Sequence, residues 1–103
     1  MLLYRVNIVP KAFADLEGIL DYISKDSPTN AARVIDRLQD AIYSLDQMPR
    51  RFKVHSCRKD MSLSVHAMPV PPYIVYYRVD DVHHAVRVLR VYDGRRLQPR
   101  RFT

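Results

Sequence analysis

The sequence predicts an α+β fold in which an N-terminal strand and an antiparallel two-helix hairpin pack on a small twisted antiparallel sheet, in the order β-α-α-β-β-β. Two neighbouring segments carry apolar residues at helical spacing, and three later segments have strand-like composition. The length of 103 residues is typical of one domain, and we expect residues 1–103 to form it. Hydrophobic residues make up 48% of the chain, which indicates a globular protein.

The first strand is expected from Leu3 to Val9, because Tyr4, Val6 and Ile8 fall on one face. Pro10 ends this strand and suits the first turn of a helix.

The first helix is predicted from Lys11 to Ser24. Its apolar stripe has steps of three and four residues and consists of Phe13, Leu16, Leu20 and Ile23. Acidic residues lie largely off this stripe, namely Asp15, Glu17 and Asp21. We expect the stripe to be part of the core.

The second helix is predicted to begin at Ser27 and Pro28, with serine as the N-cap and proline as the first helical residue. Its apolar stripe consists of Ala31, Ile35, Leu38, Ile42 and Leu45. Pro49 ends this helix. Only Lys25 to Ser27 separate the two helices, so they should form an antiparallel hairpin.

The second half of the chain begins with a basic segment, Arg50 to Asp60, which we expect to be a loop. Alternating residues from Leu63 to Ala67 predict a strand. Three prolines follow and should prevent regular pairing in a stiff connection, at positions Pro69, Pro71 and Pro72.

Two further strands are predicted at Tyr73 to Val79 and at Ala85 to Tyr92, with a turn at Asp80-Asp81 between them. The last strand is apolar on both faces, which favours an interior position. The three later strands are joined by short links and should form an antiparallel meander. The helix hairpin should cover one face of this sheet, and the other face should be partly open and carry arginines.

The charge of the chain is concentrated in its second half. Residues 1–48 contain 5 basic and 7 acidic side chains, whereas residues 49–103 contain 12 basic and 4 acidic ones. Arginine accounts for 13 of the 17 basic residues, and its planar fork of donors fits carboxylates and phosphates. This asymmetry indicates either an anionic partner or a well-solvated surface.

Composition also excludes several classes of site. Two glycines are too few for a phosphate-binding loop or a dinucleotide fingerprint, and one cysteine, Cys57, excludes a disulfide framework and a multi-cysteine zinc site. We therefore expect neither a cofactor nor a metal.

No apolar run approaches the roughly 18 residues that span a bilayer, and no secretory signal is evident, so a cytoplasmic protein is expected.

The order of these segments resembles the RelE/ParE superfamily, the toxins of type II toxin–antitoxin systems. The resemblance covers almost the whole chain and rests on Tyr4-Arg5-Val6, Pro10-Lys11-Ala12, Asp15-Leu16, Asp21-Tyr22-Ile23, Ser27-Pro28, Ala31-Ala32, Tyr73 to Val79, Val88-Leu89-Arg90-Val91 and Gly94-Arg95-Arg96. It implies two helices on a twisted antiparallel sheet, in agreement with the periodicity. It also implies one of two activities, inhibition of DNA gyrase by ParE-like members or ribosome-dependent mRNA cleavage by RelE-like members.

The ParE-like branch is favoured, since the helix hairpin is long. Many relatives carry His in a His-Gly-x-Arg ending, and this chain has Asp93 at that position. Cleavage through the 2′-OH needs a base, an acid and cations at the phosphate, and an ionised carboxylate supplies no proton. A RelE-like nuclease remains the alternative, with a metal-independent site made from Tyr92, Arg96, Lys53 and Arg58. An inactive relative that only binds its antitoxin is a second alternative.

The surface that we expect to bind the target is the basic last strand with its tail, comprising Arg87, Arg90, Tyr92, Arg95, Arg96, Arg100 and Arg101. Arg90 and Tyr92 share one strand face and could present a guanidinium and a ring to one ligand. The resemblance also implies an antitoxin partner with an acidic C-terminal segment. Gyrase would be the target, or the ribosome and mRNA in the alternative, and no membrane is involved.

Overall fold

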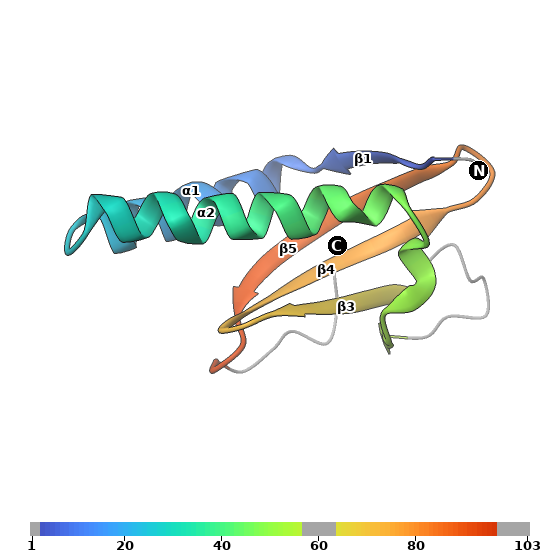
Figure 1. The fold of residues 1–103 in the computed structure, drawn as a ribbon. Helices are drawn as coiled ribbons and strands as arrows, with labels where there is room; N and C mark the ends of the chain where they lie inside the picture. The colour runs from blue at the N-terminus through green and yellow to red at the C-terminus, as the bar shows by residue number, and fades with distance from the viewer. Residues whose placement is uncertain (1–2, 57–63, 97–103) are drawn as a thin grey trace.

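The computed structural model describes residues 3–56 and 64–96. Two antiparallel helices lie side by side on a five-stranded sheet with the order β1-β5-β4-β3-β2 (Figure 1). The elements are β1 (Arg5–Ile8), α1 (Pro10–Ser24), α2 (Pro28–Tyr43), β2 (Val54–Ser56), β3 (Val65–Val70), β4 (Tyr73–Asp80) and β5 (Ala85–Asp93). Two short 3-10 helices, η1 (Ser44–Asp46) and η2 (Pro49–Arg51), connect α2 to β2. The α+β class and the predicted element order are confirmed.

The sheet is mixed rather than wholly antiparallel. β1 pairs in parallel with β5, from Arg5 opposite Ala85 to Ile8 opposite Val88, whereas the other neighbouring strands are antiparallel. A parallel pair needs a long crossover, and here the whole helix hairpin and the meander lie between its two strands. β5 therefore has a strand on each side, as its apolar composition predicted.

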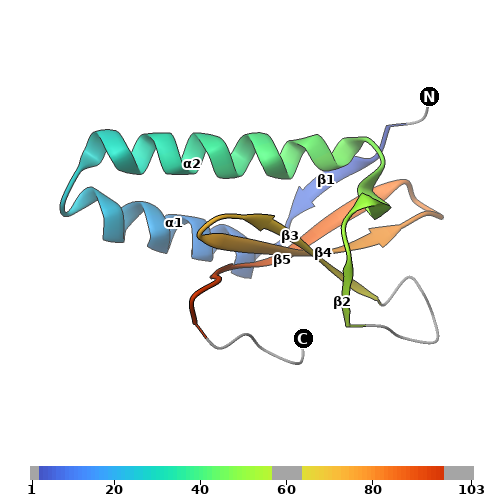
Figure 2. The ribbon, with the colours of Figure 1, turned by 60° about the horizontal axis from the view of Figure 1, so that its bottom comes forward.

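The predicted stripe of α1 is partly wrong. Ala12 and Leu16 are buried, whereas Phe13 is 55% and Leu20 is 38% exposed. The helix is rotated so that a small residue, Ala12, faces the packed interior. The tip of the hairpin also projects beyond the sheet, as Figures 1 and 2 show, so apolar residues near the end of α1 have no strand beneath them.

The expected start of α2 is confirmed. The Ser27 side chain accepts a hydrogen bond of 3.1 Å from the Asn30 N–H, and Pro28 is the first helical residue. Leu38 and Ile42 of the predicted stripe are fully buried. The helix packs on α1 and on the inner face of the sheet.

The basic segment after η2 is not entirely a loop, because it contains β2. This short strand pairs with β3, with Val54 opposite His66. Pro69 also does not prevent pairing, since it lies within β3 opposite Ile74. β2 pairs with the first residues of β3, so among the described strands none needs an N–H from Pro69 at the outer edge.

A β-bulge divides β5 into two parts. Tyr76 lies opposite Arg90 and Tyr77 lies opposite Val88, so Leu89 is an extra residue in this strand. Strict alternation would turn residue 90 toward the helices together with Val88. The bulge instead places Arg90 on the outer face and returns the next residue to the core.

The core lies between the helices and the inner face of the sheet. Its buried side chains include Leu16, Leu38, Ile42, Leu45, Met68, Val75, Tyr77, Val79, Val86, Val88 and Val91. The Tyr77 hydroxyl donates a hydrogen bond to the Pro49 carbonyl, and burial raises the pKa of Tyr77 to about 12.

In the described part of the chain, neither helix combines the length and apolar character that crossing a bilayer requires.

Replacing the N-cap should weaken α2 without changing the core. We expect Ser27→Ala to lower the free energy of unfolding by about 1 kcal/mol, because the Asn30 N–H loses its acceptor. Urea unfolding followed by circular dichroism measures the change. Thr29→Ala, in the same exposed turn, is the control, and an equal loss in both variants would show that the cap contributes nothing.

Candidate functional site

The carboxylate of Asp15 connects α1 to β5. It accepts hydrogen bonds from Nε and Nη2 of Arg90, at 2.8 and 2.9 Å, and from the Val91 N–H, at 2.9 Å. β1 ends at Ile8 beside Val88, so within residues 3–56 and 64–96 no strand pairs with this edge of β5 beyond that point. Asp15 takes the place of the missing strand and satisfies a backbone donor there.

The Asp15–Arg90 ion pair is half-buried. The side chain of Asp15 is 15% exposed and that of Arg90 is 31% exposed. The hydrogen bonds to Asp15 raise the pKa of the Arg90 guanidinium, so its charge persists at neutral pH and is matched within the protein. Arg90 is therefore committed to an internal contact, which lowers its availability to an anionic ligand.

Arg90 also begins a row of rings on the outer face of the sheet. Its guanidinium carbon lies 4.5 Å from the ring centre of Tyr92, a cation–π contact. The ring of Tyr92 is in edge contact with the ring of Tyr76, with 6.0 Å between the ring centres. The ring centre of Tyr76 lies 4.8 Å from that of His55 in β2. The predicted pairing of Arg90 and Tyr92 on one face is thus present, but the two groups contact each other.

A second ion pair, between Asp93 and Arg95, lies at the C-terminal end of β5. Asp93 accepts hydrogen bonds from the backbone N–H and the guanidinium of Arg95, with lengths of 2.7 to 2.9 Å. The hydrogen bond from the Arg95 side chain is the main cause that lowers the pKa of Asp93 to about 2.

The backbone N–H of Gly94 donates a 2.7 Å hydrogen bond to the Pro72 carbonyl, and a Cβ at residue 94 would lie 3.0 Å from that oxygen. Only glycine fits this close approach without a shift of the backbone.

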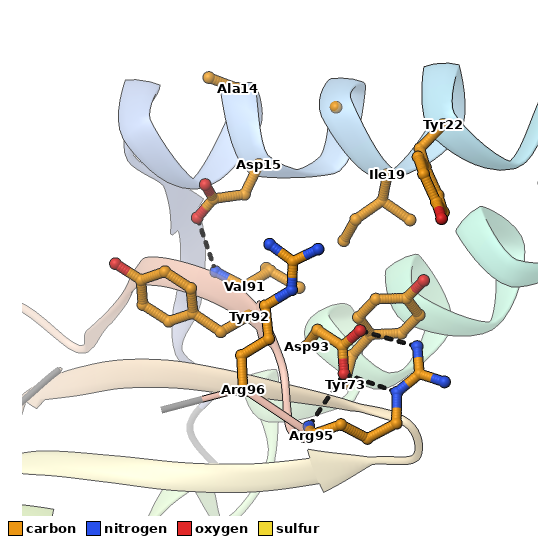
Figure 3. Close-up of a pocket in the computed structure, with 11 residues that line it drawn as sticks. Ala14, Asp15, Ile19, Tyr22, Tyr73, Val91, Tyr92, Asp93, Arg95 and Arg96 are labelled. Atoms are coloured by element: carbon orange, nitrogen blue, oxygen red, sulfur yellow. Dashed lines mark hydrogen bonds and ion pairs between the residues drawn. The ribbon is translucent and has the colours of Figure 1, made fainter. Parts of the chain in front are cut away.

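A cavity of about 360 Å³ lies between α1 and this end of β5 (Figure 3). Its apolar lining comes from Ala14, Gly18, Ile19 and Val91, and its polar lining from Asp15, Tyr22, Tyr73, Tyr92, Asp93, Arg95 and Arg96. Figure 3 shows the Arg96 side chain reaching from the strand end toward α1. The site therefore combines an apolar interior with aromatic and cationic side chains, which suits binding.

The predicted residues fall into three places. Tyr92, Arg95 and Arg96 line this cavity, whereas Arg87 is exposed elsewhere on β5. Lys53 lines a separate cavity with Phe52, Pro69 and Ile74. The predictions for Arg58, Arg100 and Arg101 lie outside the described residues.

Sequence reasoning missed the role of Asp15. Its position beside Leu16, between the buried Ala12 and the half-buried Ile19, was a usable signal, because acidic residues on an inward helix face usually have a partner. Within residues 3–56 and 64–96, no three His, Cys, Asp or Glu side chains are grouped as metal ligands would be.

Comparison with known proteins identifies the family. The family model described as ParE toxin of the type II toxin–antitoxin system parDE matches residues 6–98. This chain therefore belongs to the RelE/ParE family of type II toxins. Toxin RelE2 of Caulobacter vibrioides is 37% identical over 79 residues, which cover 76% of this chain and 84% of that protein.

Solved structures of the same family share the fold. The toxin–antitoxin complex RelBE2 of Mycobacterium tuberculosis contains a chain with a TM-score of 0.59 and 28% identity, with 90% of this chain and 93% of that chain covered. The chromosomal ParDE system of P. aeruginosa gives a TM-score of 0.69 at 19% identity, with 90% and 98% covered. The named relatives include both ParE and RelE proteins.

Removing the Asp15 carboxylate should loosen α1 from the sheet. We expect Asp15→Ala to lower the free energy of unfolding by about 2–3 kcal/mol, because Arg90 and the Val91 N–H both lose their acceptor. Urea unfolding measures the loss. Asp21→Ala, an exposed site on the same helix, should change stability by less than about 0.5 kcal/mol, and similar losses in both variants would refute the role of Asp15.

The Asp93 carboxyl should titrate at unusually low pH. A carboxyl with a lowered pKa in the folded state stabilises the fold above its ordinary pKa of about 3.9, and this contribution is lost as the pH falls toward 2. Carbon-detected NMR of the side chain measures the titration. In Arg95→Ala the Asp93 pKa should rise, whereas Arg33→Ala should leave it unchanged; a normal pKa in the unmodified protein would contradict the ion pair.

Proposed function

We propose that this chain is the toxin of a type II toxin–antitoxin pair and that it acts by binding DNA gyrase rather than by cleaving mRNA. The observation that carries the proposal is the state of Asp93. This residue stands where many relatives have a histidine, and Arg95 holds its pKa at about 2. At neutral pH it therefore has no proton to give to a leaving oxygen.

The positions of the other candidate groups also favour binding over catalysis. General acid–base catalysis requires the groups to meet within hydrogen-bonding distance of one reacting site. Tyr92 and Arg96 share one cavity, but Lys53 lines another. The nearby charge of Arg90 is matched by Asp15, so it offers little stabilisation to a developing negative charge.

The cavity beside α1 is the surface that we propose for the target. Tyr22 is 72% exposed and lines this cavity together with Arg95 and Arg96. Aromatic residues and arginine contribute most of the binding energy in many protein interfaces, especially around an apolar pocket. Arg87 lies outside this cavity and is not part of the proposed gyrase surface.

We further propose an antitoxin partner with an acidic segment. The structural relative from M. tuberculosis is itself a toxin–antitoxin complex. The strongly basic second half of this chain would attract such a segment and accelerate its association. Binding should therefore weaken as the salt concentration rises.

A supercoiling assay with purified gyrase tests the target. We expect the protein to block supercoiling and Arg96→Ala to raise the half-inhibitory concentration about tenfold, since one interface arginine is lost. Arg33→Ala, on the exposed side of α2, is the control for charge. Full supercoiling at a large excess of the folded protein would refute the gyrase proposal.

The second candidate is a ribosome-dependent mRNA endonuclease, which the 37% identity to Toxin RelE2 favours. Primer extension on messages from cells that produce the chain would then show new ends within codons, and Arg96→Ala would remove them. If new mRNA ends appear and gyrase activity is unaffected, the endonuclease proposal would replace the gyrase proposal.

The third alternative is an inactive chain that only binds its antitoxin. Cells that continue to grow after induction of the chain would indicate this alternative.

A further inference from the structure

The cavity beside α1 contains a buried tyrosine whose hydroxyl has no partner in the described part of the chain. Tyr73, the first residue of β4, is 8% exposed and lines this cavity. Figure 3 shows the hydroxyl groups of Tyr73 and Tyr22 pointing toward each other. Within residues 3–56 and 64–96, the Tyr73 hydroxyl makes no hydrogen bond. A buried hydroxyl without a partner lowers stability, so an acceptor from another molecule would be favourable here.

Tyr73 lies in a region where positive charge exceeds negative charge. Burial raises the pKa of its hydroxyl and Asp93 adds to this effect, whereas Arg95 and Arg37 oppose it. Arg37 is held in place by a 2.7 Å hydrogen bond from its Nη2 to the Pro71 carbonyl. The hydroxyl therefore keeps its proton at neutral pH and can donate it. With two guanidinium groups and one carboxylate nearby, a negatively charged acceptor is favoured.

Arg95 provides further donors at the same place. Its Nε and Nη2 bind Asp93, and its Nη1 makes no hydrogen bond within the ranges that the structure describes. The hydrogen bond to Asp93 is the main cause that raises the pKa of Arg95, and the nearby phenols of Tyr73 and Tyr22 contribute to it. Nη1 of Arg95 and the Tyr73 hydroxyl can therefore donate to the two oxygens of one carboxylate.

The opposite wall of the cavity includes exposed helix backbone at Gly18. Glycine in the interior of a helix is less stable than alanine. Packing against the described residues does not account for the glycine, since a Cβ at position 18 would meet no atom within 4 Å. The absent side chain leaves space in which a flat group can lie against α1.

The size and the lining of the cavity suit a small aromatic acid. Its volume of about 360 Å³ lies near the lower limit of small-molecule pockets, about 300 to 1,000 Å³. Ala14, Ile19 and Val91 give it apolar surface against which one or two fused rings can pack. A phenylalanine or tryptophan side chain of a protein partner would fill this space, but it carries no acceptor for the donors. A free aromatic carboxylic acid supplies both the ring and the acceptor.

We propose that the cavity beside α1 binds a small aromatic carboxylate, with its ring against Gly18 and its carboxylate held by Tyr73 and Arg95. This ligand would occupy the surface that we propose for the target, so its binding would regulate the toxin by competition. The competition rests on the proposed function, whereas the binding of the acid rests on the cavity alone.

NMR of the full, isotope-labelled chain titrated with naphthoate tests the site. We expect saturable shifts of the amide signals of Gly18, Ile19 and Val91, with a dissociation constant below about 1 mM. Naphthylmethanol has the same rings without the charge, and octanoate has the carboxylate without the rings. Each should bind at least about tenfold more weakly than naphthoate. Absent or unsaturable shifts, or equal binding of either control compound, would overturn the proposal.

Two substitutions test the two halves of the site. Tyr73→Phe removes the donor and keeps the ring, so naphthoate should bind about five- to tenfold more weakly. Gly18→Ala fills the space beside the helix, so binding should fall at least about tenfold while the protein unfolds at a higher urea concentration. Tyr43→Phe, at an exposed position at the end of α2, is the matched control and should bind naphthoate normally. Unchanged affinity in Tyr73→Phe or Gly18→Ala, or an equal loss in Tyr43→Phe, would contradict the site.

A supercoiling assay in the presence of naphthoate separates this inference from the gyrase proposal. Saturating naphthoate should restore supercoiling in the presence of the protein, and gyrase with naphthoate alone is the control. Protein that binds naphthoate through Tyr73 but leaves supercoiling intact would refute only the gyrase proposal. Inhibition of gyrase by protein that does not bind naphthoate would refute only the ligand site. Inhibition that persists when the cavity is saturated would refute the competition.

Discussion

One carboxylate, that of Asp15, joins the helical layer to the sheet at the edge where β1 ends. β1 pairs with β5 over four residues, Arg5–Ile8, and beyond them α1 is the described element that lies beside the edge of β5. Asp15 supplies the acceptor that a neighbouring strand would have provided, and it binds Arg90 at the same time. Asp15 also lines the cavity beside α1, and its partner Arg90 contacts the ring of Tyr92. A buried backbone donor left without an acceptor would make the same junction costly.

The positive charge of the chain is less available than its total suggests. Arg90 lies on β5 and Arg95 lies just after the end of this strand, and each is paired with a carboxylate of the protein itself. The described cationic side chains that line cavities are therefore spread over separate sites, of which one contains Arg51 and Lys53 beside β3. Arg96 lies at the C-terminal end, and Arg87 lies near the β4–β5 turn with Arg78 opposite it. This separation would allow two different partners to bind without competing for the same arginine.

Much of the fold follows from local sequence patterns, because α2 and the strands of the meander have clear periodicity and recognisable end signals. The exposure of Phe13 was not predictable, since a helix that packs against both another helix and a sheet edge can be rotated by one residue. The bulge at Leu89 was hidden for a similar reason, as both faces of β5 are apolar. Tyr92 and Arg96 could be grouped because they are close in sequence. The Asp15–Arg90 contact joins residues 75 positions apart, and no local pattern indicates which residue pairs with Asp15.

The parallel pairing of the first and last strands has a consequence for synthesis. While a ribosome is still translating the meander, the residues of β1 have already emerged, but the strand that will pair with them does not yet exist. Contacts between such distant parts of a chain form late and slowly. The nascent chain can therefore reach its final topology only after β5 has left the exit tunnel. Premature termination before β5 would yield a fragment without a completed sheet.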